Sequence, residues 1–576
     1  MKSSLLAILA FVRSSYAASV KRASPIVVLD DGTFIGTTTG AVNSWLGIPF
    51  AQPPVGNLRF AKPVANNPYN GTRTVTAYGP ACPQQAITLP LISGLPADTV
   101  NFIVNTIFGA VFPDDEDCLT INVIVLLAAR VAPTSATPSS KLPVVVWIFG
   151  GGFELGSPSM VTGIMAPRYP GQPIVQRSID LGEPVVYVSM NYRVSAFGFL
   201  ASQEVKDAGV GNLGLRDQRL ALQWVQKYIS NFGGDPTKVT IWGESAGAIS
   251  VAMQMITNGA NTEGLFRAGF MQSGSPIPVG DITHGQTYYD FIVGQTGCAS
   301  SSDTLQCLRG VPYQTLKDAV DKTPDIFSYQ SLVLAWLPRV DGDFLTTAPQ
   351  QLVQQGSVAD IPFINGDCDD EGTLFSLANA NITTEAEVAT YINTYYLPEA
   401  SSAQVSQLLA AYPADPADGS PFNTGSLNAI TPQFKRLAAM QGDVVFNAPR
   451  RFFIQAQAGK QKVWSYSCVF YHTVASRPTD RFIVHKRLKA LPVLGAGHGT
   501  DILDIYGGTD MTDYLIHFAV NLDPNGVGLL QWPQYSTAAP TLLTFLDGLA
   551  TESTEQDTFR AEGFNILTNL SLQFPL

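Results

Sequence analysis

The amino-acid sequence predicts an α/β fold in which helices flank a large, mostly parallel central sheet. Two observations carry this prediction. From residue 142 onward, continuous apolar runs that suit strands covered on both faces alternate with segments of helical periodicity. Glycine-rich turns directly follow two of these runs. Strand–helix–strand alternation is typical of a sheet whose strands are mainly parallel.

Each element follows from its own pattern. Residues 24–60 contain short β-type stretches separated by Gly and Pro. The later elements, in chain order, are expected as strand 142–149, strand 183–192, helix 213–229, strand 238–242, helix 248–256 and strand 361–365, followed by a largely helical region at 383–460. No internal repeat and no linker composition interrupts the chain, so residues 24–576 are expected to form a single domain.

Composition excludes several classes of protein. The chain has 576 residues, of which 45% are hydrophobic and 14% charged, a balance that favours a large core and excludes disorder. The formal net charge is −12, and no cluster of Lys and Arg provides the positive face that nucleic acid requires. No apolar stretch reaches the length that spans a bilayer, so no transmembrane segment is expected.

The N-terminus predicts export. Residues 1–17 combine Lys2, a short apolar run and small residues near a cleavage position, which is typical of a signal peptide. Residues 18–23 contain the basic pair Lys21-Arg22, which fits a propeptide cut and an ordinary exposed N-terminus equally well. An extracellular protein can carry N-linked glycans, and the acceptor triplet occurs at Asn70, Asn381 and Asn569.

Six cysteines in an exported chain favour disulfides, although six allow 15 pairings. Cys82 and Cys118 bracket one local segment, and Cys298 and Cys307 bracket another, so these two pairs suit local bridges. Cys368 and Cys468 remain, either free or paired. No CxxC motif is present, and neither a zinc site nor any other metal or cofactor is expected.

Residues 243–247 (GESAG) match the G-x-S-x-G turn that presents a nucleophilic serine. The motif lies between a predicted strand and a predicted helix of small residues, which is the context it requires. A side chain at either Gly would collide with neighbouring backbone, and the helix dipole would favour a developing oxyanion. Ser245 is therefore the predicted nucleophile; a serine that only caps the helix is the structural alternative.

Acyl transfer also needs hydrogen-bond donors for the oxyanion. Residues 150–152 form a Gly triplet directly after the predicted strand 142–149, and a Gly-rich loop lets backbone N–H groups approach a ligand closely. Ala246, immediately after the nucleophile, would supply another N–H donor. The structural alternative is that the triplet forms only a flexible turn.

A nucleophilic serine needs a histidine base, and in the fold that carries the G-x-S-x-G turn the chain order is serine, acid, histidine. His284 comes too early, His517 lies in an apolar helical run, and His472 and His485 lie in the irregular segment 467–487. His498 lies between glycines in a loop, so it is the predicted base. The acid is less determined: spacing does not choose between Asp369, Asp370 and Glu371, and clustered acids in a loop are most often simply solvated.

Three long motifs resemble the type-B carboxylesterase/lipase family, especially its fungal secreted lipases and sterol esterases of the Candida rugosa type. They lie at residues 47–60 (GIPFAQPPVGNLRF), 116–122 (EDCLTIN) and 232–247 (FGGDPTKVTIWGESAG), and the resemblance extends over nearly the whole chain. It implies the α/β-hydrolase fold. The functional residues that the resemblance implies are Ser245, Glu371 and His498 as catalytic triad, Gly151, Gly152 and Ala246 as oxyanion donors, and Cys82–Cys118 and Cys298–Cys307 as disulfides. Segment 467–487 departs from the family pattern and has the character of an insertion or of a mis-spliced gene model.

The segment between Cys82 and Cys118 bears on the substrate. Apolar residues recur at helical spacing over 97–112, which fits either a helix packed in the core or an apolar helix that opens at a lipid surface. The resemblance implies a mobile lid over residues 83–117 and favours acylglycerols or steryl esters at a lipid–water interface as substrates. A carboxylesterase for small soluble esters is the alternative enzyme. A binding protein without catalysis is a second class, disfavoured because the full catalytic set is present. The sequence does not decide between a monomer and a homodimer.

Overall fold

The computed structural model describes residues 24–88, 92–93, 95–103, 113–127, 141–158, 169–469, 493–546 and 551–576. The predicted signal peptide and propeptide lie outside the described residues. So do residues 470–492, which hold most of the irregular segment with His472 and His485, and residues 104–112, which hold most of the predicted lid helix.

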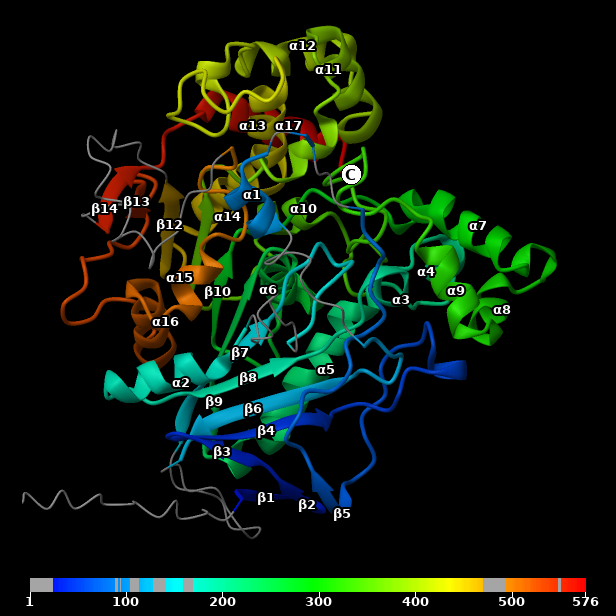
Figure 1. The fold of residues 1–576 in the computed structure, drawn as a ribbon, viewed down its shortest axis with the longest axis vertical. Coiled ribbons are helices and arrows are strands. Elements are labelled where there is room, and N and C mark those ends of the chain that lie inside the picture. The colour runs from blue at the N-terminus through cyan, green and yellow to red at the C-terminus, as the bar shows by residue number, and fades with distance from the viewer. Residues whose placement is uncertain are drawn as a thin grey trace, which may run out of the picture.

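An eleven-stranded sheet forms the centre of the molecule (Figure 1), with strand order β14-β13-β12-β11-β10-β9-β7-β8-β6-β4-β3. All pairs from β8 across to β13 are parallel, and the pairs at both edges are antiparallel. The strands are β3 (Thr37–Thr39), β4 (Val42–Pro49), β6 (Thr120–Leu126), β7 (Leu142–Ile148), β8 (Val186–Met190), β9 (Gly234–Glu244), β10 (Ala268–Gln272), β11 (Phe363–Cys368), β12 (Val463–Val469), β13 (Thr541–Leu546) and β14 (Glu552–Gln556). The predicted mostly parallel sheet is confirmed.

A second, three-stranded sheet lies at the N-terminal end of the chain, with order β1-β2-β5. Its strands are β1 (Ile26–Leu29), β2 (Asp31–Ile35) and β5 (Asn70–Thr74). The short β stretches predicted over residues 24–60 are therefore divided between this small sheet and the edge of the large one.

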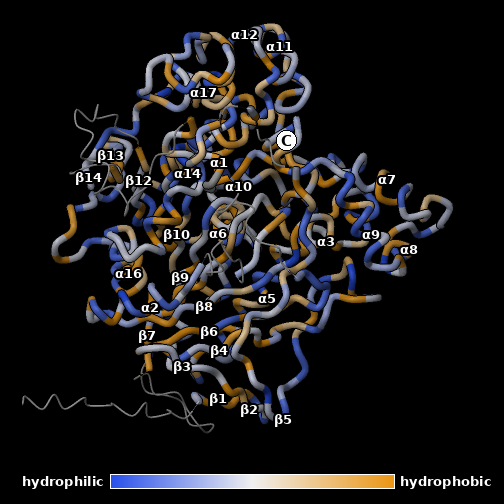
Figure 2. The backbone as a smooth tube through the Cα atoms, in the orientation of Figure 1, coloured by the Kyte–Doolittle hydropathy of each residue, from blue (hydrophilic) through white to orange (hydrophobic). Residues whose placement is uncertain are grey.

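The continuous apolar runs become strands that are buried on both faces. Every residue from Val144 to Phe149 in and after β7 has no exposed surface. Successive side chains of a strand point to opposite faces of the sheet, and all side chains of this run are apolar. Helices must therefore cover both faces of the sheet. In Figure 2 the central strands and helix α6 are coloured mainly hydrophobic.

Two groups of helices provide this cover. Helices α5, α6, α10 and α14 pack on one another and on β7 and β9–β12, while α2, α15 and α16 form a second group on β6–β9. The helices are α1 (Ala97–Phe102), α2 (Gly171–Asp180), α3 (Ser195–Phe199), α4 (Gln203–Asp207), α5 (Leu213–Tyr228), α6 (Ala246–Ile256), α7 (Gln286–Gln295), α8 (Thr304–Gly310), α9 (Tyr313–Val320), α10 (Pro349–Gln354), α11 (Glu385–Tyr391), α12 (Ser402–Ala411), α13 (Phe434–Gly442), α14 (Ala448–Gln457), α15 (Ile502–Tyr506), α16 (Asp510–Asn521) and α17 (Ala561–Gln573).

The predicted helices are present, with boundaries shifted by a few residues. Helix α6 begins two residues earlier than predicted, because the turn at the nucleophile motif leads directly into it. Strand β9 begins at Gly234 rather than residue 238, just after Gly233 ends the preceding short helix with φ of 88°. Residues 383–460 are largely helical, as expected, and contain α11 to α14, with a long connection over residues 412–433.

Both expected disulfides are present: Cys82–Cys118 and Cys298–Cys307. Cys368 and Cys468 are not disulfide-bonded. The acceptor residues Asn70, Asn381 and Asn569 are all exposed. In the parts of the chain that the structure describes, no helix is both long and apolar enough to cross a membrane.

Candidate active site

The carboxyl end of β9 presents Ser245 on a sharp turn. The strand ends at Glu244, Ser245 has φ 56° and ψ −126°, and α6 begins at the next residue. A Cβ atom at Gly247 would lie 2.0 Å from the carbonyl oxygen of Ile148, and one at Gly243 would lie 2.4 Å from the carbonyl carbon of Gly247. The backbone therefore permits only glycine at both positions, which is the collision that the sequence motif implies.

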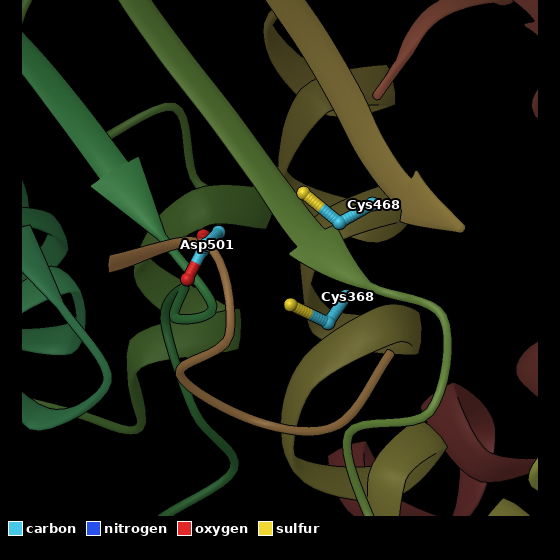
Figure 3. Close-up of side chains that lie close together, drawn as sticks. All are labelled: Cys368, Cys468 and Asp501. Carbon is cyan, nitrogen blue, oxygen red and sulfur yellow. The ribbon is translucent and has the colours of Figure 1, made fainter. Parts of the chain in front are cut away.

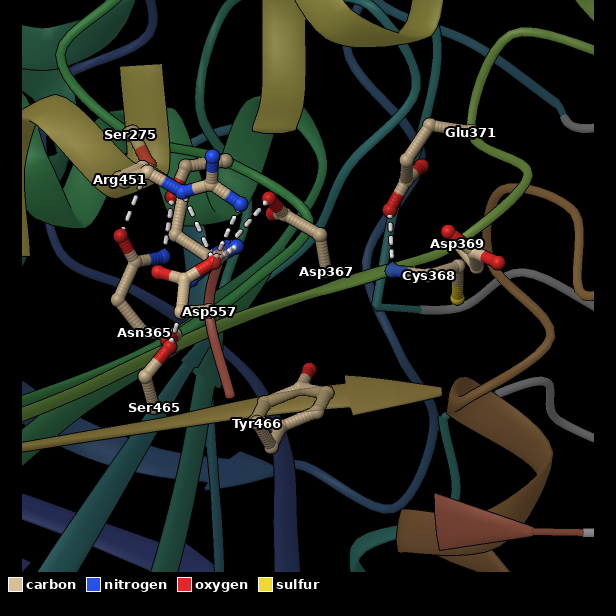
Figure 4. A network of polar contacts seen from close by, with 12 residues as sticks. Ser275, Asn365, Asp367, Cys368, Asp369, Glu371, Arg451, Ser465, Tyr466 and Asp557 are labelled. Atoms are coloured by element: carbon tan, nitrogen blue, oxygen red, sulfur yellow. Dashed lines mark hydrogen bonds and ion pairs between the residues drawn. The ribbon is translucent and has the colours of Figure 1, made fainter. Parts of the chain in front are cut away.

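Three predicted residues from distant parts of the chain come together at this turn. The His498 Nε2 atom lies 2.8 Å from Ser245 Oγ, and its Nδ1 atom lies 2.5 Å from Glu371 Oε2. The other carboxylate oxygen of Glu371 accepts a hydrogen bond of 2.6 Å from the backbone N–H of Cys368 (Figure 4). A hydroxyl, an imidazole and a carboxylate in this order can move a proton from the hydroxyl to the ring.

Burial makes the charges at this site consequential. Glu371 is fully buried, and Ser245 and His498 are each 8% exposed. Burial of the imidazole opposes its charged form, but the Glu371 carboxylate outweighs this effect and raises the pKa of His498 above the usual 6.5. Glu244 adds to the same effect, since its Oε1 atom lies 3.5 Å from His498 Nε2.

The two neighbouring acids have other partners. Asp369 forms an ion pair of 3.1 Å with Arg560. Asp370 accepts hydrogen bonds from the Ser420 hydroxyl and from the backbone N–H groups of Phe422 and Ala496, at 2.8 to 2.9 Å. Asp370 therefore connects the loop that carries Glu371 to the loop that carries His498, and only Glu371 of the three acids contacts the imidazole.

A buried ion-pair network supports the strand beneath Glu371 (Figure 4). Arg450 lies 3.0 Å from both Asp367 and Asp557, and Arg451 lies 2.7 Å from Asp557. Burial disfavours both carboxylates, but the two arginines outweigh it at Asp557 and lower its pKa to about 2. Among the described residues, Asp367 pairs with Arg450 alone, so burial dominates and raises its pKa. This network joins β11 to α14 and to the end of β14.

The Gly triplet forms a tight turn against Ser245. Gly151 has φ 121° and Gly152 has φ 64°, conformations that side chains other than glycine rarely adopt. A Cβ atom at Gly150 would lie 2.8 Å from the Ser245 Cβ. Gly151, Gly152, Ser245 and His498 line one common pocket, and Ala246 contributes the first N–H of α6, which has no partner inside a helix. Gly151, Gly152 and Ala246 therefore bring backbone N–H groups to the pockets that Ser245 lines.

Two cavities meet at Ser245. One has an almost entirely apolar lining: Gly152, Phe153, Ser245, Ala246, Ile249, Ile277, Pro278, Ile326, Leu332, Leu334, Leu337, Phe375, Val445, Phe446 and Leu576. The other includes the Gly triplet, Tyr169, Glu244 and His498. Ser245 therefore lines an apolar pocket on one side and a more polar pocket on the other.

Sequence reasoning missed some residues of the site. The rings of Phe375 and Phe446 pack on the His498 ring, with centroids 5.2 and 4.7 Å away, and shield it from water. Nothing in the local sequence marks Phe446, whereas Glu244 lies inside the nucleophile motif and could have been considered. The other described histidines lie elsewhere: His284 is exposed, and His517 pairs with Glu183 at 2.7 Å, as expected for a satisfied histidine in a helix.

Comparison with known proteins identifies the family of this chain. The model of the carboxylesterase family matches residues 23–561. The chain belongs to the carboxylesterase family. This membership makes it a carboxylic ester hydrolase, and the resemblance and the fold expected from the sequence are confirmed.

Several carboxylesterase relatives are similar over nearly their whole length. "Lipase 4" of Diutina rugosa is 42% identical over 571 residues, covering 96% of this chain and 97% of that protein. "Secreted triacylglycerol lipase LIP1" of Gibberella zeae is 38% identical, covering 96% and 92%. The crystal structure of Aspergillus niger EstA superposes with a TM-score of 0.76 at 25% identity, covering 96% of this chain and 99% of that one.

Proposed function

We propose that this carboxylesterase is a secreted lipase that cleaves lipid esters through an acyl-enzyme on Ser245. The observation that carries the proposal is the chain of hydrogen bonds from Ser245 through His498 to Glu371, placed beside an apolar cavity. Acylglycerols are the proposed main substrates, and steryl esters are proposed as further substrates.

In the proposed reaction, Ser245 Oγ attacks the ester carbonyl carbon while its proton passes to His498 Nε2. The negative charge that develops on the carbonyl oxygen is stabilised by the N–H groups of Gly151, Gly152 and Ala246. The tetrahedral intermediate collapses as His498 returns its proton to the departing alcohol, which leaves the acyl group on Ser245. Water, activated by His498, then attacks the acyl carbon and releases the carboxylic acid. Glu371 orients the ring and stabilises its positive charge throughout.

The apolar cavity supports a long acyl chain as the acid part of the substrate. Burial of each methylene of such a chain contributes about 0.8 kcal/mol, so a cavity lined by leucines and phenylalanines favours long chains over acetate. A relative whose name includes triacylglycerol lipase supports the same choice. Small soluble esters remain the alternative substrate class.

A rate series tests the substrate class. Purified enzyme is assayed on p-nitrophenyl esters of increasing chain length, on triolein emulsion and on cholesteryl oleate, with the Ser245→Ala variant as the control for the nucleophile. We expect kcat/KM to increase with chain length, emulsified triolein to be cleaved, and Ser245→Ala to lose about 10⁶-fold in kcat while remaining folded. A preference for acetate together with no cleavage of triolein would favour the soluble-ester alternative, and an active, folded Ser245→Ala variant would exclude Ser245 as nucleophile.

Secretion has a separate test. The predicted signal peptide and the relatives named as secreted lipases support export. N-terminal sequencing of the protein from culture medium should find a chain that begins after residue 17 or after residue 22. Retention of Met1 on an intracellular protein would contradict export.

A further inference from the structure

Three potential metal-binding side chains come together directly behind the active site, outside the machinery described above. Cys368 ends β11, Cys468 lies on the neighbouring strand β12 as its direct partner, and Asp501 belongs to the loop that follows His498. Figure 3 shows both sulfur atoms on the side where Asp501 lies. One donor atom from each residue lies within 4.8 Å of the other two, and all three residues have no exposed surface.

The separations suit one small, thiophilic cation. Zn–S bonds of about 2.3 Å in a tetrahedron put two sulfur atoms about 3.8 Å apart, and Zn–O bonds are about 2.0–2.2 Å long. Two donor atoms bonded to one ion therefore lie closer together than 4.8 Å, the limit within which the three donor atoms lie in this structure. Shifts of the side chains by about 1 Å would bring the three donor atoms to bonding distance of one ion. Thr500 could contribute further, because its hydroxyl oxygen lies 3.5 Å from the Cys368 sulfur.

An independent observation points to a missing partner. Asp501 Oδ2 accepts hydrogen bonds from the Tyr466 hydroxyl at 2.7 Å and the Gln272 amide at 3.0 Å. Asp501 Oδ1 is buried and accepts no hydrogen bond from any residue that the structure describes. A buried carboxylate oxygen without a partner is costly, and a bound cation would remove that cost.

We propose that Cys368, Cys468 and Asp501 form a binding site for a single d¹⁰ cation such as Zn²⁺. On binding, each thiol loses its proton, so one divalent ion enters and two protons leave, and no electron is transferred. The two thiolates formed on binding balance the charge of the divalent ion, so binding leaves the net charge of the buried site unchanged. Soft thiolate donors favour Zn²⁺ and Cd²⁺ over Mg²⁺ and Ca²⁺.

The location gives the site a structural consequence. Cys368 lies three residues before Glu371 and Asp501 lies three residues after His498. A bound ion would therefore connect the strand end that carries the acid to the loop that carries the base. Because it would bind only the folded chain, it should raise the melting temperature.

Cd²⁺ alone is the probe, because Cd²⁺–thiolate bonds absorb in the ultraviolet. The wild-type enzyme is equilibrated with Cd²⁺ for a long period, since the site is buried, and enzyme produced in Zn²⁺-supplemented medium is analysed for metal content. We expect one ion per chain, release of about two protons per ion, and a higher melting temperature. The matched control is His284→Ala, which removes an exposed histidine and should bind Cd²⁺ as the wild type does.

The variants Cys468→Ser and, separately, Asp501→Asn test the donors. Each should lower Cd²⁺ affinity by more than about 100-fold, because even substitutions outside the ligand shell cost 10–100-fold. Cys468→Ser should also weaken the thiolate absorption, because only Cys368 then supplies a thiolate; if it does not fold, the Cd²⁺ affinity of Asp501→Asn still tests the site. Absence of metal from both preparations, unchanged affinity in a folded variant, or recovery of Cys368 and Cys468 as a disulfide in a non-reducing peptide map would overturn the proposal.

Discussion

The Glu371→Gln substitution tests the assignment of the acid most directly. The change keeps the shape of the side chain and removes its charge. Glu371 Oε1 accepts the N–H of Cys368 at 2.6 Å, so the amide oxygen of Gln should occupy that position and leave the amide NH₂ facing His498 Nδ1. His498 must then accept at Nδ1 and carry its proton on Nε2, where it faces Ser245 and cannot receive the serine proton.

The expected loss follows from this wrong tautomer. An equivalent change in a serine hydrolase lowers kcat by about 10⁴-fold, which is about 5.4 kcal/mol at 1.36 kcal/mol per tenfold. The pH profile should change as well. Attack needs the neutral imidazole, and Glu371 raises the pKa of His498, so wild-type kcat/KM should increase with pH through an acid limb above 6.5. Glu371→Gln removes the charge that stabilises the imidazolium, so the limb should move to lower pH.

The assay measures kcat and kcat/KM for a p-nitrophenyl ester across pH, with circular dichroism to verify folding. Asp369→Asn is the matched control. It removes the same charge from the same loop, but the Asp369 carboxylate pairs with Arg560 and not with His498. It should stay within about threefold of wild-type activity, as expected for a residue outside the reaction. If Glu371→Gln keeps more than about a tenth of kcat, or if Asp369→Asn or Asp370→Asn is the crippled variant, the reasoning is refuted.

Three further predictions address the turn at Ser245, the apolar cavity beside it, and residues 97–112 in the loop that the Cys82–Cys118 disulfide closes. Gly247→Ala should destabilise the protein by at least about 4 kcal/mol, because the new Cβ would lie 2.0 Å from the Ile148 carbonyl oxygen. The matched control is Gly294→Ala, since nothing lies within 4 Å of a Cβ at that position. Equal melting temperatures for the two variants would contradict this prediction. Leu334→Trp should displace about four methylenes of a long acyl chain from the apolar cavity, at about 0.8 kcal/mol each. The variant should therefore lower kcat/KM for long-chain esters about 200-fold and leave hydrolysis of p-nitrophenyl acetate nearly unchanged. An equal loss on both substrates would exclude this cavity as the acyl site. If residues 97–112 act as a lid, Ile103→Ser should depress hydrolysis of emulsified triolein far more than hydrolysis of p-nitrophenyl acetate. Equal losses on both substrates, together with a lower melting temperature, would instead assign the fully buried Ile103 to core packing.

Local sequence was sufficient for the parts of the site that one continuous segment builds. The turn at Ser245 follows from two glycines that no other residue can replace and from the strand and helix beside them. The Gly triplet and the glycines around His498 mark loops in the same way, because positive φ angles and close backbone contacts restrict residue choice at each position. The apolar runs likewise determine which segments become buried strands, since only a covered sheet removes them from water.

Apart from the triad that the family resemblance implied, only the tertiary structure decided which side chains from separate segments meet. Asp369, Asp370 and Glu371 are consecutive acids with the same local chemistry, and the fold gives them Arg560, the His498 loop and the His498 ring as different partners. Phe446 reaches the imidazole from a helical region with no motif. Cys368, Cys468 and Asp501 likewise have no metal-binding spacing, and adjacent parallel strands bring residues a hundred positions apart into direct register. Long-range contacts of this kind depend on strand order and loop conformation, which a single stretch of sequence does not encode.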